Sequence, residues 1–266
     1  MKTGFIGAGK MAEALISGLL RSGFAVPQDV VASDISGERL ALLRNRYGIT
    51  VAASNEELLS CATTVFLAVK PQDMDGLLSR VAPSATAEHL VVSIAAGKTL
   101  AYLESFLTLS RVVRVMPNMA CLVGAGMSVF CPGSRATRED ALLVGKILSC
   151  SGEAIELPEE KFDAVTALSG SGPAFFAYWL KCLAEGGVAA GLAPSEAHKL
   201  SVQTMLGTAV ALKERGMSPA ELISAVASPK GTTAAGLAVL DRSDAADIAM
   251  RCIAAAAARS RELSLS

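Results

Sequence analysis

Thr3-Gly4-Phe5-Ile6-Gly7-Ala8-Gly9-Lys10-Met11-Ala12 is the stretch of sequence that most strongly predicts the fold. Its first residues form a short apolar strand pattern. Its glycines fit G-x-G-x-x-G/A, which joins a strand to a helix in dinucleotide-binding domains. The first glycine permits a tight turn, the second lets a pyrophosphate approach the backbone, and the small third residue allows close helix–strand packing. Because the helix would present unpaired N–H groups to the phosphates, we expect a dinucleotide to bind here.

Apolar, β-branched runs alternate with helical spacing through the first 157 residues. Strands that are apolar throughout and alternate with helices are typical of a parallel sheet covered on both faces. The pattern predicts an α/β, Rossmann-type parallel-sheet domain over residues 1–157. The expected strands cover residues 3–7, 30–33, 51–53, 65–69, 90–95 and 111–116, and the expected helices cover 10–21 and 38–46 or begin after 54, 71 and 99.

The character of the sequence changes at Leu157-Pro158-Glu159-Glu160. From residue 162 onward the spacing is helical, punctuated by glycine and proline, and no stretch has a strand pattern. Small residues are frequent there, as in Ala189-Ala190-Gly191 and in 254–258. Because small residues let helix backbones approach closely, we expect residues 158–266 to form an all-α domain that packs into a dimer.

Composition excludes several classes of protein. The 266 residues suffice for two ordinary domains. The 24 Lys and Arg nearly balance 25 Asp and Glu, so a basic face for nucleic acid is not expected. Hydrophobic residues make up 52% and aromatic residues only 5%, and this aliphatic surplus indicates subunit interfaces. With no long uninterrupted apolar run, the chain is not expected to cross a membrane.

Location and metal content are predicted from a few residue types. The chain begins directly with a strand pattern and shows no signal peptide. Its six cysteines lie far apart without C-x-x-C, which is typical of reduced cysteines, and we expect a cytoplasmic protein. His89 and His198 are the only histidines, so we expect no metal site.

Two residues near the end of the second strand leave the cofactor open. Asp34 lies where an acidic residue would accept a hydrogen bond from the ribose 2′-OH of NAD. Arg39 could instead meet the 2′-phosphate of NADP. Alternatively, Asp34 caps the helix that begins near Ser36. The residues are therefore compatible with NADP(H) or NAD(H).

Two glycine- or proline-containing motifs in the first half have structural alternatives. Gly97-Lys98-Thr99 is similar to the end of a phosphate-binding P-loop, but Val92 stands where that pattern needs glycine, so we exclude it. Arg114-Val115-Met116-Pro117-Asn118 ends a strand at the edge where α/β sheets bind ligands, or it only forms a turn.

Two motifs in the second half can likewise be interpreted as ligand-binding or as structural. Ser169-Gly170-Ser171-Gly172-Pro173 is either a hinge beside a ligand or a loop before a helix. No histidine is near Ser171, so a hydrolase nucleophile is excluded. Ser228-Pro229-Lys230-Gly231-Thr232-Thr233 could form an anion-binding nest, or it is an interhelical loop with capping threonines.

Taken together, these motifs resemble those of the pyrroline-5-carboxylate reductases, which catalyse the last step of proline biosynthesis. The resemblance covers essentially the whole chain, and the serine–glycine–proline block and the late threonine loop are its most specific parts. The motifs that carry it are Gly4 to Gly9, Ala68-Val69-Lys70-Pro71, Ser93 to Gly97, Asp163-Ala164-Val165-Thr166, Ser169 to Ala174, and Ser228-Pro229 with Gly231-Thr232-Thr233.

The resemblance implies a Rossmann domain, a helical domain that interlocks into a homodimer, and an open choice of larger assembly up to a decamer of dimers. It implies that hydride passes from NADPH or NADH to the imine carbon of 1-pyrroline-5-carboxylate and yields L-proline. The residues that would hold the pyrophosphate are Ile6, Gly7, Ala8, Gly9, Lys10 and Met11, and those that would line the adenosine and nicotinamide path are Asn55, Val69, Lys70, Pro71 and Ala96.

The resemblance also implies a substrate site at Glu159 and in the loop from Lys230 through Gly231 and Thr232 to Thr233. The amides of residues 230–232 would bind the carboxylate, and Thr233 would hydrogen-bond the ring nitrogen. The imine is basic and can arrive protonated, so orientation rather than a strong general acid would provide catalysis.

The sequence departs from the family pattern at two places. Met119-Ala120 follow Asn118 where the family usually has threonine–proline, and Lys230 replaces a glycine. Both departures concern the shape of one edge of the pocket and how the carboxylate is held.

Two other functions compete with this interpretation. A β-hydroxyacid dehydrogenase also joins a Rossmann domain to helices, but its catalytic lysine would fall at Phe176, which cannot move a proton. A non-catalytic NAD(P)-sensing module would keep the glycine pattern and have no use for the polar late loop. Turnover of NAD(P)H with pyrroline-5-carboxylate separates the three.

Overall fold

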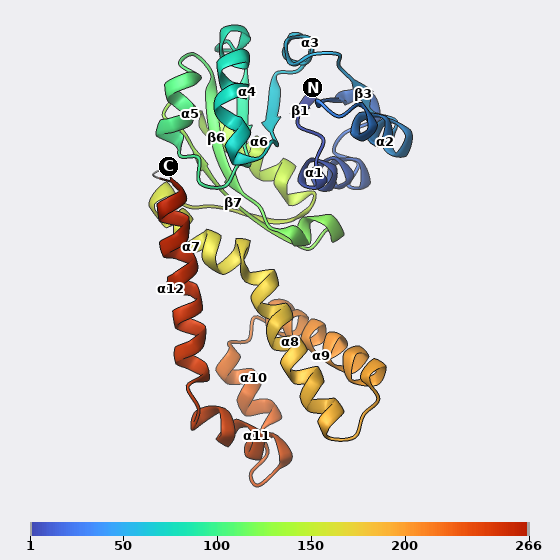
Figure 1. Cartoon of the computed structure of the whole chain (residues 1–266), viewed down its shortest axis with the longest axis vertical. Coiled ribbons are helices and arrows are strands. Elements are labelled where there is room, and N and C mark those ends of the chain that lie inside the picture. Colours follow the sequence, from blue (N-terminus) through green and yellow to red (C-terminus); the bar gives the residue numbers. More distant parts are fainter. Residues whose placement is uncertain (1, 265–266) are drawn as a thin grey trace. The chain divides into compact units, whose positions relative to one another are not determined.

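The computed structural model describes residues 2–264, which divide into two compact units (Figure 1). Within the described residues, unit 1 holds 2–171 together with 255–264, and unit 2 holds 172–254. The domain boundary expected after residue 157 stays a prediction. In the fold, residues 158–171 and the end of the last helix pack with the sheet.

Unit 1 is built on one eight-stranded sheet in the order β3-β2-β1-β4-β5-β6-β7-β8. The strands from β1 to β6 pair in parallel, which confirms the predicted Rossmann-type sheet. β7 runs antiparallel to β6 and pairs in parallel with β8, and the sequence analysis predicted neither strand. The strands are β1 (Thr3–Ile6), β2 (Val30–Ser33), β3 (Thr50–Val51), β4 (Thr64–Leu67), β5 (Leu90–Ser93), β6 (Arg111–Met116), β7 (Gly126–Pro132) and β8 (Gly152–Glu156).

Helices cover both faces of this sheet, as Figure 1 shows. On one face α1, α2 and α6 pack through a core that includes Leu15 and Ile147. On the other, α3, α4 and α5 pack through a core that includes Leu78 and Leu103. Each such side chain stabilises the fold by about 1.5–3 kcal/mol relative to an exposed one. The helices are α1 (Lys10–Arg21), α2 (Gly37–Tyr47), α3 (Asn55–Cys61), α4 (Met74–Val81), α5 (Leu100–Phe106), α6 (Arg138–Ser149) and α7 (Phe162–Val165).

The first helix forms where the apolar spacing predicts it. Leu15, Ile16 and Leu19 recur at helical intervals and are all buried against the sheet. The chain leaves α1 through Gly23, whose φ of 71° lies in the left-handed region that glycine adopts without strain. This fixed helix positions the glycine loop at its N-terminus.

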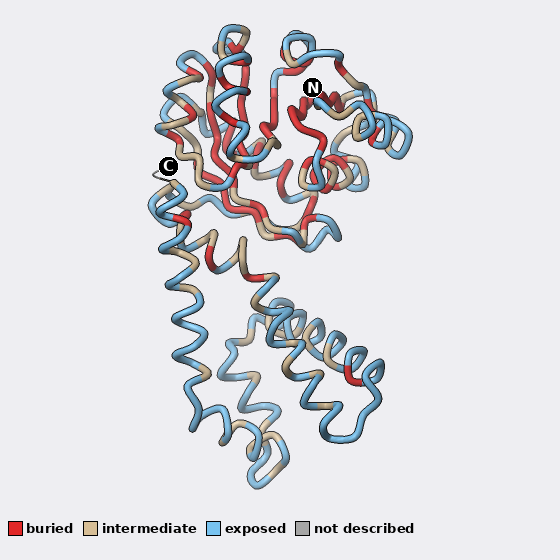
Figure 2. Tube along the Cα trace, viewed as in Figure 1, coloured by how far each residue is buried: buried red, intermediate tan, exposed pale blue. Residues whose placement is uncertain are grey.

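Unit 2 contains only helices among its described residues, as predicted. Figure 2 shows that its trace is mostly exposed, whereas buried residues concentrate along the strands of unit 1. Large apolar side chains such as Phe176, Leu183 and Leu206 are exposed, and they line a groove of about 760 Å³ along α8 and α9. The helices are α8 (Gly172–Ala189), α9 (Pro194–Arg215), α10 (Pro219–Val226), α11 (Thr232–Asp241) and α12 (Ala245–Ser264), the last of which ends in unit 1.

Candidate active site

The glycine loop after β1 has the geometry that an anion-binding turn requires. Gly7 has a φ of 100°, and a methyl group there would lie 2.7 Å from the carbonyl oxygen of Ala68, so only glycine fits. The Gly7 amide donates to the Ser33 carbonyl at 2.8 Å and fixes the turn against β2. The neighbouring strand ends thus hold the loop in one conformation.

The start of α1 is open in the way that a pyrophosphate needs. Gly9 is its N-cap residue and no side chain caps the helix. A methyl group at Gly9 would meet nothing within 4 Å. The first helical amides therefore face open space and combine with the positive end of the helix dipole. This chain's residues fit the phosphates of a dinucleotide.

Asp34 joins this loop to Ser36, the residue immediately before the next helix. Its Oδ2 accepts from the Ala8 amide at 2.5 Å and its Oδ1 accepts from the Ser36 amide at 2.8 Å. The N-cap of α2 is Ser36, whose hydroxyl accepts from the amide of Arg39. Asp34 thus braces the glycine loop, and the capping role considered for it belongs to Ser36.

Arg39 holds the same loop through the next peptide group, which follows Ala8. Its Nε donates to the Ala8 carbonyl at 2.8 Å and a terminal nitrogen donates to Glu13 at 2.8 Å. Arg46 and Tyr47 also donate to Glu13. Burial raises the pKa of Glu13, but the hydrogen bond and charge of Arg39, with help from Tyr47 and Arg46, lower that pKa below its ordinary value. The loop backbone is therefore anchored by an ionic network on α1 and α2.

The other predicted cofactor residues follow the carboxyl ends of neighbouring strands. The order β2-β1-β4-β5 places the Gly7 loop between Asp34 and the segment Val69-Lys70-Pro71, with Ala96 after β5. Asn55 accepts from the Ser33 hydroxyl at 2.8 Å and so joins the edge at β2. In such sheets ligands bind where the strand order reverses, here between β1 and β4. The fold brings the predicted cofactor set together along one edge.

Glu159 has strong partners within unit 1. Its Oε1 accepts from Arg114 and from the Leu100 amide, each at 2.7 Å. Arg114 is only 5% exposed, and its guanidinium lies 4.6 Å from the centre of the Phe162 ring. The sequence analysis considered Arg114 only as part of a strand end. An arginine in the middle of the apolar run 112–116 was the available signal for this partly buried ion pair, and the substrate role of Glu159 stays a prediction.

The late loop lies in unit 2 and has an unusual backbone. Among the described residues, Lys230 is the only non-glycine with positive φ, at 61°. The Gly231 amide donates to the Ser228 carbonyl at 3.0 Å, which closes a turn, and a side chain at Gly231 would collide with the Ser228 hydroxyl. α11 then begins at Thr232.

The start of α11 leaves donors available. No side chain caps this helix. Within the part of the chain that the structure describes, the hydroxyl of Thr233 has no hydrogen-bond partner. The turn and the helix start therefore offer amides, a hydroxyl and the exposed Lys230 ammonium, a set suited to a small carboxylate with a nitrogen next to it.

The remaining motifs have structural partners. Thr99 caps α5 and Lys98 lies over the Tyr102 ring, which agrees with the exclusion of a P-loop there. Asn118 accepts from the amides of Ala120 and Met127 and so closes the turn after β6. The serine–glycine block begins in a π-helical turn, Thr166–Gly170, a distortion that is frequent at functional sites.

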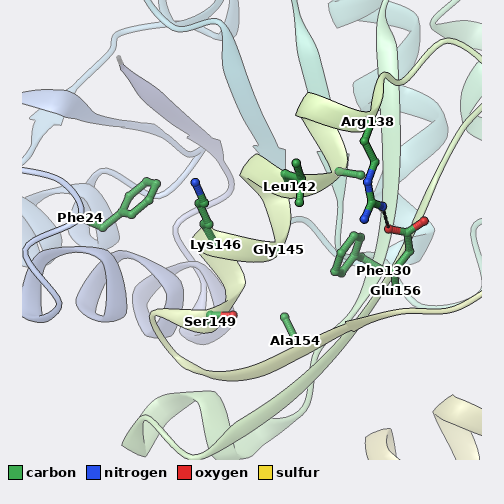
Figure 3. A pocket seen from close by; sticks show the side chains of 10 residues that line it. Phe24, Phe130, Arg138, Leu142, Gly145, Lys146, Ser149, Ala154 and Glu156 are labelled. Carbon is green, nitrogen blue, oxygen red and sulfur yellow. Dashed lines mark hydrogen bonds and ion pairs between the residues drawn. The ribbon is translucent and has the colours of Figure 1, made fainter.

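A separate hollow of about 560 Å³ lies between α6 and the outer strands, away from every predicted site residue (Figure 3). Figure 3 shows the ion pair between Arg138 and Glu156, 2.8 Å long, at its border. Lys146 and Phe24 also line it. None of its residues belongs to the glycine loop or the late loop, so this hollow is no part of the candidate active site.

Two features are absent from residues 2–264. No helix there is long and apolar enough to cross a membrane. No group of three or more histidine, cysteine or acidic side chains there could hold a metal ion.

Two known protein families match different parts of the chain. Residues 2–97 match the model described as NADP oxidoreductase, coenzyme F420-dependent, and residues 159–263 match pyrroline-5-carboxylate reductase dimerisation. With the doubly covered sheet and its glycine loop, the first match defines an oxidoreductase of the nicotinamide-dependent class. The second match restricts that class to enzymes with a helical dimerisation domain.

Full-length relatives identify the family. Pyrroline-5-carboxylate reductase 3 of Rattus norvegicus is 41% identical over 264 residues, which cover 99% of this chain and 96% of the rat protein. The pyrroline-5-carboxylate reductase of Methanosarcina acetivorans is 41% identical over 263 residues, or 98% of this chain and 97% of that protein. This chain belongs to the pyrroline-5-carboxylate reductases, a family of NAD(P)H-dependent oxidoreductases that act on a C=N bond.

Solved structures agree over the whole chain. A reductase of this family from Coxiella burnetii superimposes with a TM-score of 0.95 at 30% identity and covers 99% of this chain and 98% of that one. The Plasmodium falciparum pyrroline carboxylate reductase, solved with NADP bound, gives a TM-score of 0.87 at 28% identity, again covering 99% and 98%.

Proposed function

We propose that this protein transfers a hydride from NAD(P)H to the imine carbon of 1-pyrroline-5-carboxylate and releases L-proline, the last step of proline biosynthesis. The observation that carries the proposal is 41% identity over 99% of the chain to a pyrroline-5-carboxylate reductase. The glycine loop of unit 1 and the uncapped late loop of unit 2 supply the two binding chemistries that this reaction needs.

Unit 1 would bind the cofactor along the edge formed by the ends of β1, β2, β4 and β5. When bound, the reduced nicotinamide supplies the hydride. The amides at the start of α1 would hold the pyrophosphate, and Asp34 and Arg39 keep their loop in shape through Ala8. Val69, Lys70, Pro71 and Ala96 would line the path toward the nicotinamide. The residues support either NADP(H) or NAD(H).

The late loop would orient the substrate. The amides around Gly231 and Thr232 and the charge of Lys230 would bind the carboxylate, which fixes one end of the ring. The Thr233 hydroxyl can both donate and accept a hydrogen bond, so it can hold the ring nitrogen before and after reduction. Glu159 is proposed as a further substrate-binding residue. Holding the imine carbon in one orientation accounts for catalysis without a histidine or a metal-bound base.

We also infer a homodimer formed through unit 2 in the cytoplasm, where the six unpaired cysteines would stay reduced. The exposed apolar side chains of α8 and α9 support a subunit interface. Sedimentation at micromolar concentration tests this assembly. A monomer, with Leu206→Glu behaving as the wild type does, would contradict it, and a decamer of dimers would show as a much larger species.

One assay tests the activity. Purified protein is mixed with pyrroline-5-carboxylate and NADPH or NADH, and both loss of reduced cofactor and formation of proline are followed. Stoichiometric proline supports the proposal. Cofactor binding without turnover would favour a sensing module. In a parallel assay with a β-hydroxyacid and NAD(P)+, oxidation of the acid and reduction of the cofactor would favour the dehydrogenase class, which Phe176 argues against because it offers no proton.

A further inference from the structure

The end of the last helix lies against the loop that follows β5. This loop, residues 94–99, carries the predicted cofactor residue Ala96 and turns at Gly97, whose φ is 74°. A methyl group at Gly97 would lie 3.1 Å from the Leu263 carbonyl oxygen and 3.5 Å from the Leu263 Cβ. The loop backbone therefore touches the final turn of α12, and residue 97 is kept small by that contact.

A second contact fixes the same helix end. The Ser260 hydroxyl donates to Asp163 at 2.7 Å, and Arg261 lies 3.6 Å from the other carboxylate oxygen of Asp163. Ser260 is 6% exposed and is the one buried residue of α12. A buried serine on an otherwise exposed helix indicates a specific docking point, because its hydrogen bond to a carboxylate is lost if the helix shifts.

The segment that receives Ser260 also holds the far end of the loop. Four residues before Asp163, Glu159 accepts from the Leu100 amide, which directly follows the loop. Arg114 fixes Glu159 and is itself buried. The loop after β5 is thus held at Gly97 by the α12 end and at Leu100 by Glu159, with Ser260–Asp163 connecting the two supports.

These contacts all lie within unit 1, although α12 begins in unit 2. Resting on the proposed cofactor site, we infer that residues 260–264 of α12, here named the C-terminal turn, position the loop after β5 for nicotinamide binding, with Ser260 as the positioning residue. Ser260 does not touch the cofactor. It acts through Asp163 and through the Leu263–Gly97 contact. The helix that leaves the dimerisation unit therefore ends as a support of the cofactor loop.

The test compares Ser260→Ala with the wild-type protein in its full-length assembled form. The dissociation constant of NADPH, measured by its fluorescence on binding, should rise about three- to ten-fold, and the cofactor KM should rise in parallel. The kcat at saturating NADPH and substrate should change less than about two-fold, because the late loop is untouched. Sedimentation should match the wild type.

The matched control is Ser79→Ala, which removes a hydroxyl that donates at 2.8 Å to the Asp75 carbonyl within α4. Because Ser79 is exposed and bonds only within its own helix, this change should alter stability little and leave NADPH affinity unchanged. The milder Asp163→Asn keeps an acceptor for Ser260 and removes the charge beside Arg261. The dissociation constant of NADPH should therefore rise about two- to three-fold. This variant decides the matter if Ser260→Ala does not fold.

Unchanged NADPH affinity in Ser260→Ala, with only a lower melting temperature, would overturn the inference and leave the contact as a fold support. An equal loss of NADPH affinity in Ser79→Ala would also overturn the inference. The wild type serves as the separate test of the proposed function. If it neither binds NADPH nor forms proline, that function fails, whereas a normal wild type with an indifferent Ser260→Ala overturns only the positioning role.

Discussion

Asp34 and Ala8 are joined across 26 positions of sequence by a hydrogen bond of 2.5 Å from the Ala8 amide to the carboxylate. The carbonyl of the same residue accepts from Arg39. Two side chains of opposite charge therefore hold Ala8 of the glycine loop through the two peptide groups on either side of it, and both are positions where Rossmann proteins distinguish NAD from NADP. The residues that hold the loop are therefore the same ones that are proposed to contact the adenosine ribose.

Replacing Asp34 separates these two effects. Asp34→Ser removes a negative charge near the expected 2′-phosphate, so the ratio of kcat/KM for NADPH to that for NADH should rise by several-fold. Removing the two amide contacts should also cost about 1–3 kcal/mol of stability. Steady-state kinetics with both cofactors and thermal unfolding measure the two results. An unchanged ratio in a destabilised protein would show that Asp34 only braces the loop.

Glu13 should give the protein a recognisable acid response. Its pKa is lowered in the folded state, so its stabilising effect is fully present above the unfolded value of 4.5 and is lost as pH falls through the lower folded value. Glu13→Gln should therefore cost about 1 kcal/mol at neutral pH, and the difference from wild type should shrink below about pH 4.5. Urea unfolding across pH checks this.

The control for Glu13 is Arg46→Gln. Arg46 is 66% exposed and supplies only one outer contact, so its loss should change stability little. A Glu13→Gln effect that stays constant from neutral to acid pH would argue against an ionic role for the carboxylate.

The proposed role of Thr233 predicts a loss of activity without loss of fold. Thr233→Ala should lower kcat/KM for the substrate by about ten-fold or more, since a hydrogen bond to the ring nitrogen would be absent. Thr233→Ser keeps a hydroxyl and should recover most of the activity. Wild-type kinetics in the alanine variant would remove Thr233 from the mechanism.

Replacing Lys230 should have opposite effects on stability and on substrate binding. Its φ of 61° is unfavourable for a residue with a Cβ, so Lys230→Gly should stabilise the protein by about 1 kcal/mol. The same change should raise the substrate KM and weaken its dependence on salt, because an ammonium group is lost near the carboxylate.

Lys230→Gln is the matched variant, since it keeps the strained backbone and removes the charge. It should raise KM as Lys230→Gly does, without the gain in stability. If both variants bind substrate like the wild type, the carboxylate is held by the backbone amides alone.

Local sequence signals predicted the first six strands and the glycine loop because each is an apolar run or a steric requirement that lies in a few consecutive residues. β7 and β8 escaped prediction. β7 follows a turn closed by Asn118, and in β8 Glu153 and Glu156 flank a single exposed Ile155, so its apolar content is low. β7 pairs with a strand on each side and β8 is the edge strand, and both gain their structure from this pairing rather than from their own pattern.

For the candidate site, too, the sequence predicted the local segments and not the contacts between distant residues. The glycine pattern and the family resemblance named the loops, but the contacts that fix them join distant positions. Arg39 with Ala8, Arg114 with Glu159 and Ser260 with Asp163 depend on the folded chain, and no spacing rule connects their members. A sequence shows which groups are present, whereas tertiary packing decides which of them meet.

The two outer strands have a consequence for how the protein behaves at high concentration. An exposed strand edge is a template on which another chain can add, and natural sheets limit it with short strands or charged side chains. Here one edge is β3, two residues long, and the other is β8, which bears Glu153 and Glu156. A strand of another molecule therefore has few backbone groups to pair with at either edge. The sheet is protected in this way from aggregation by strand addition, and we expect association to occur through the helical unit.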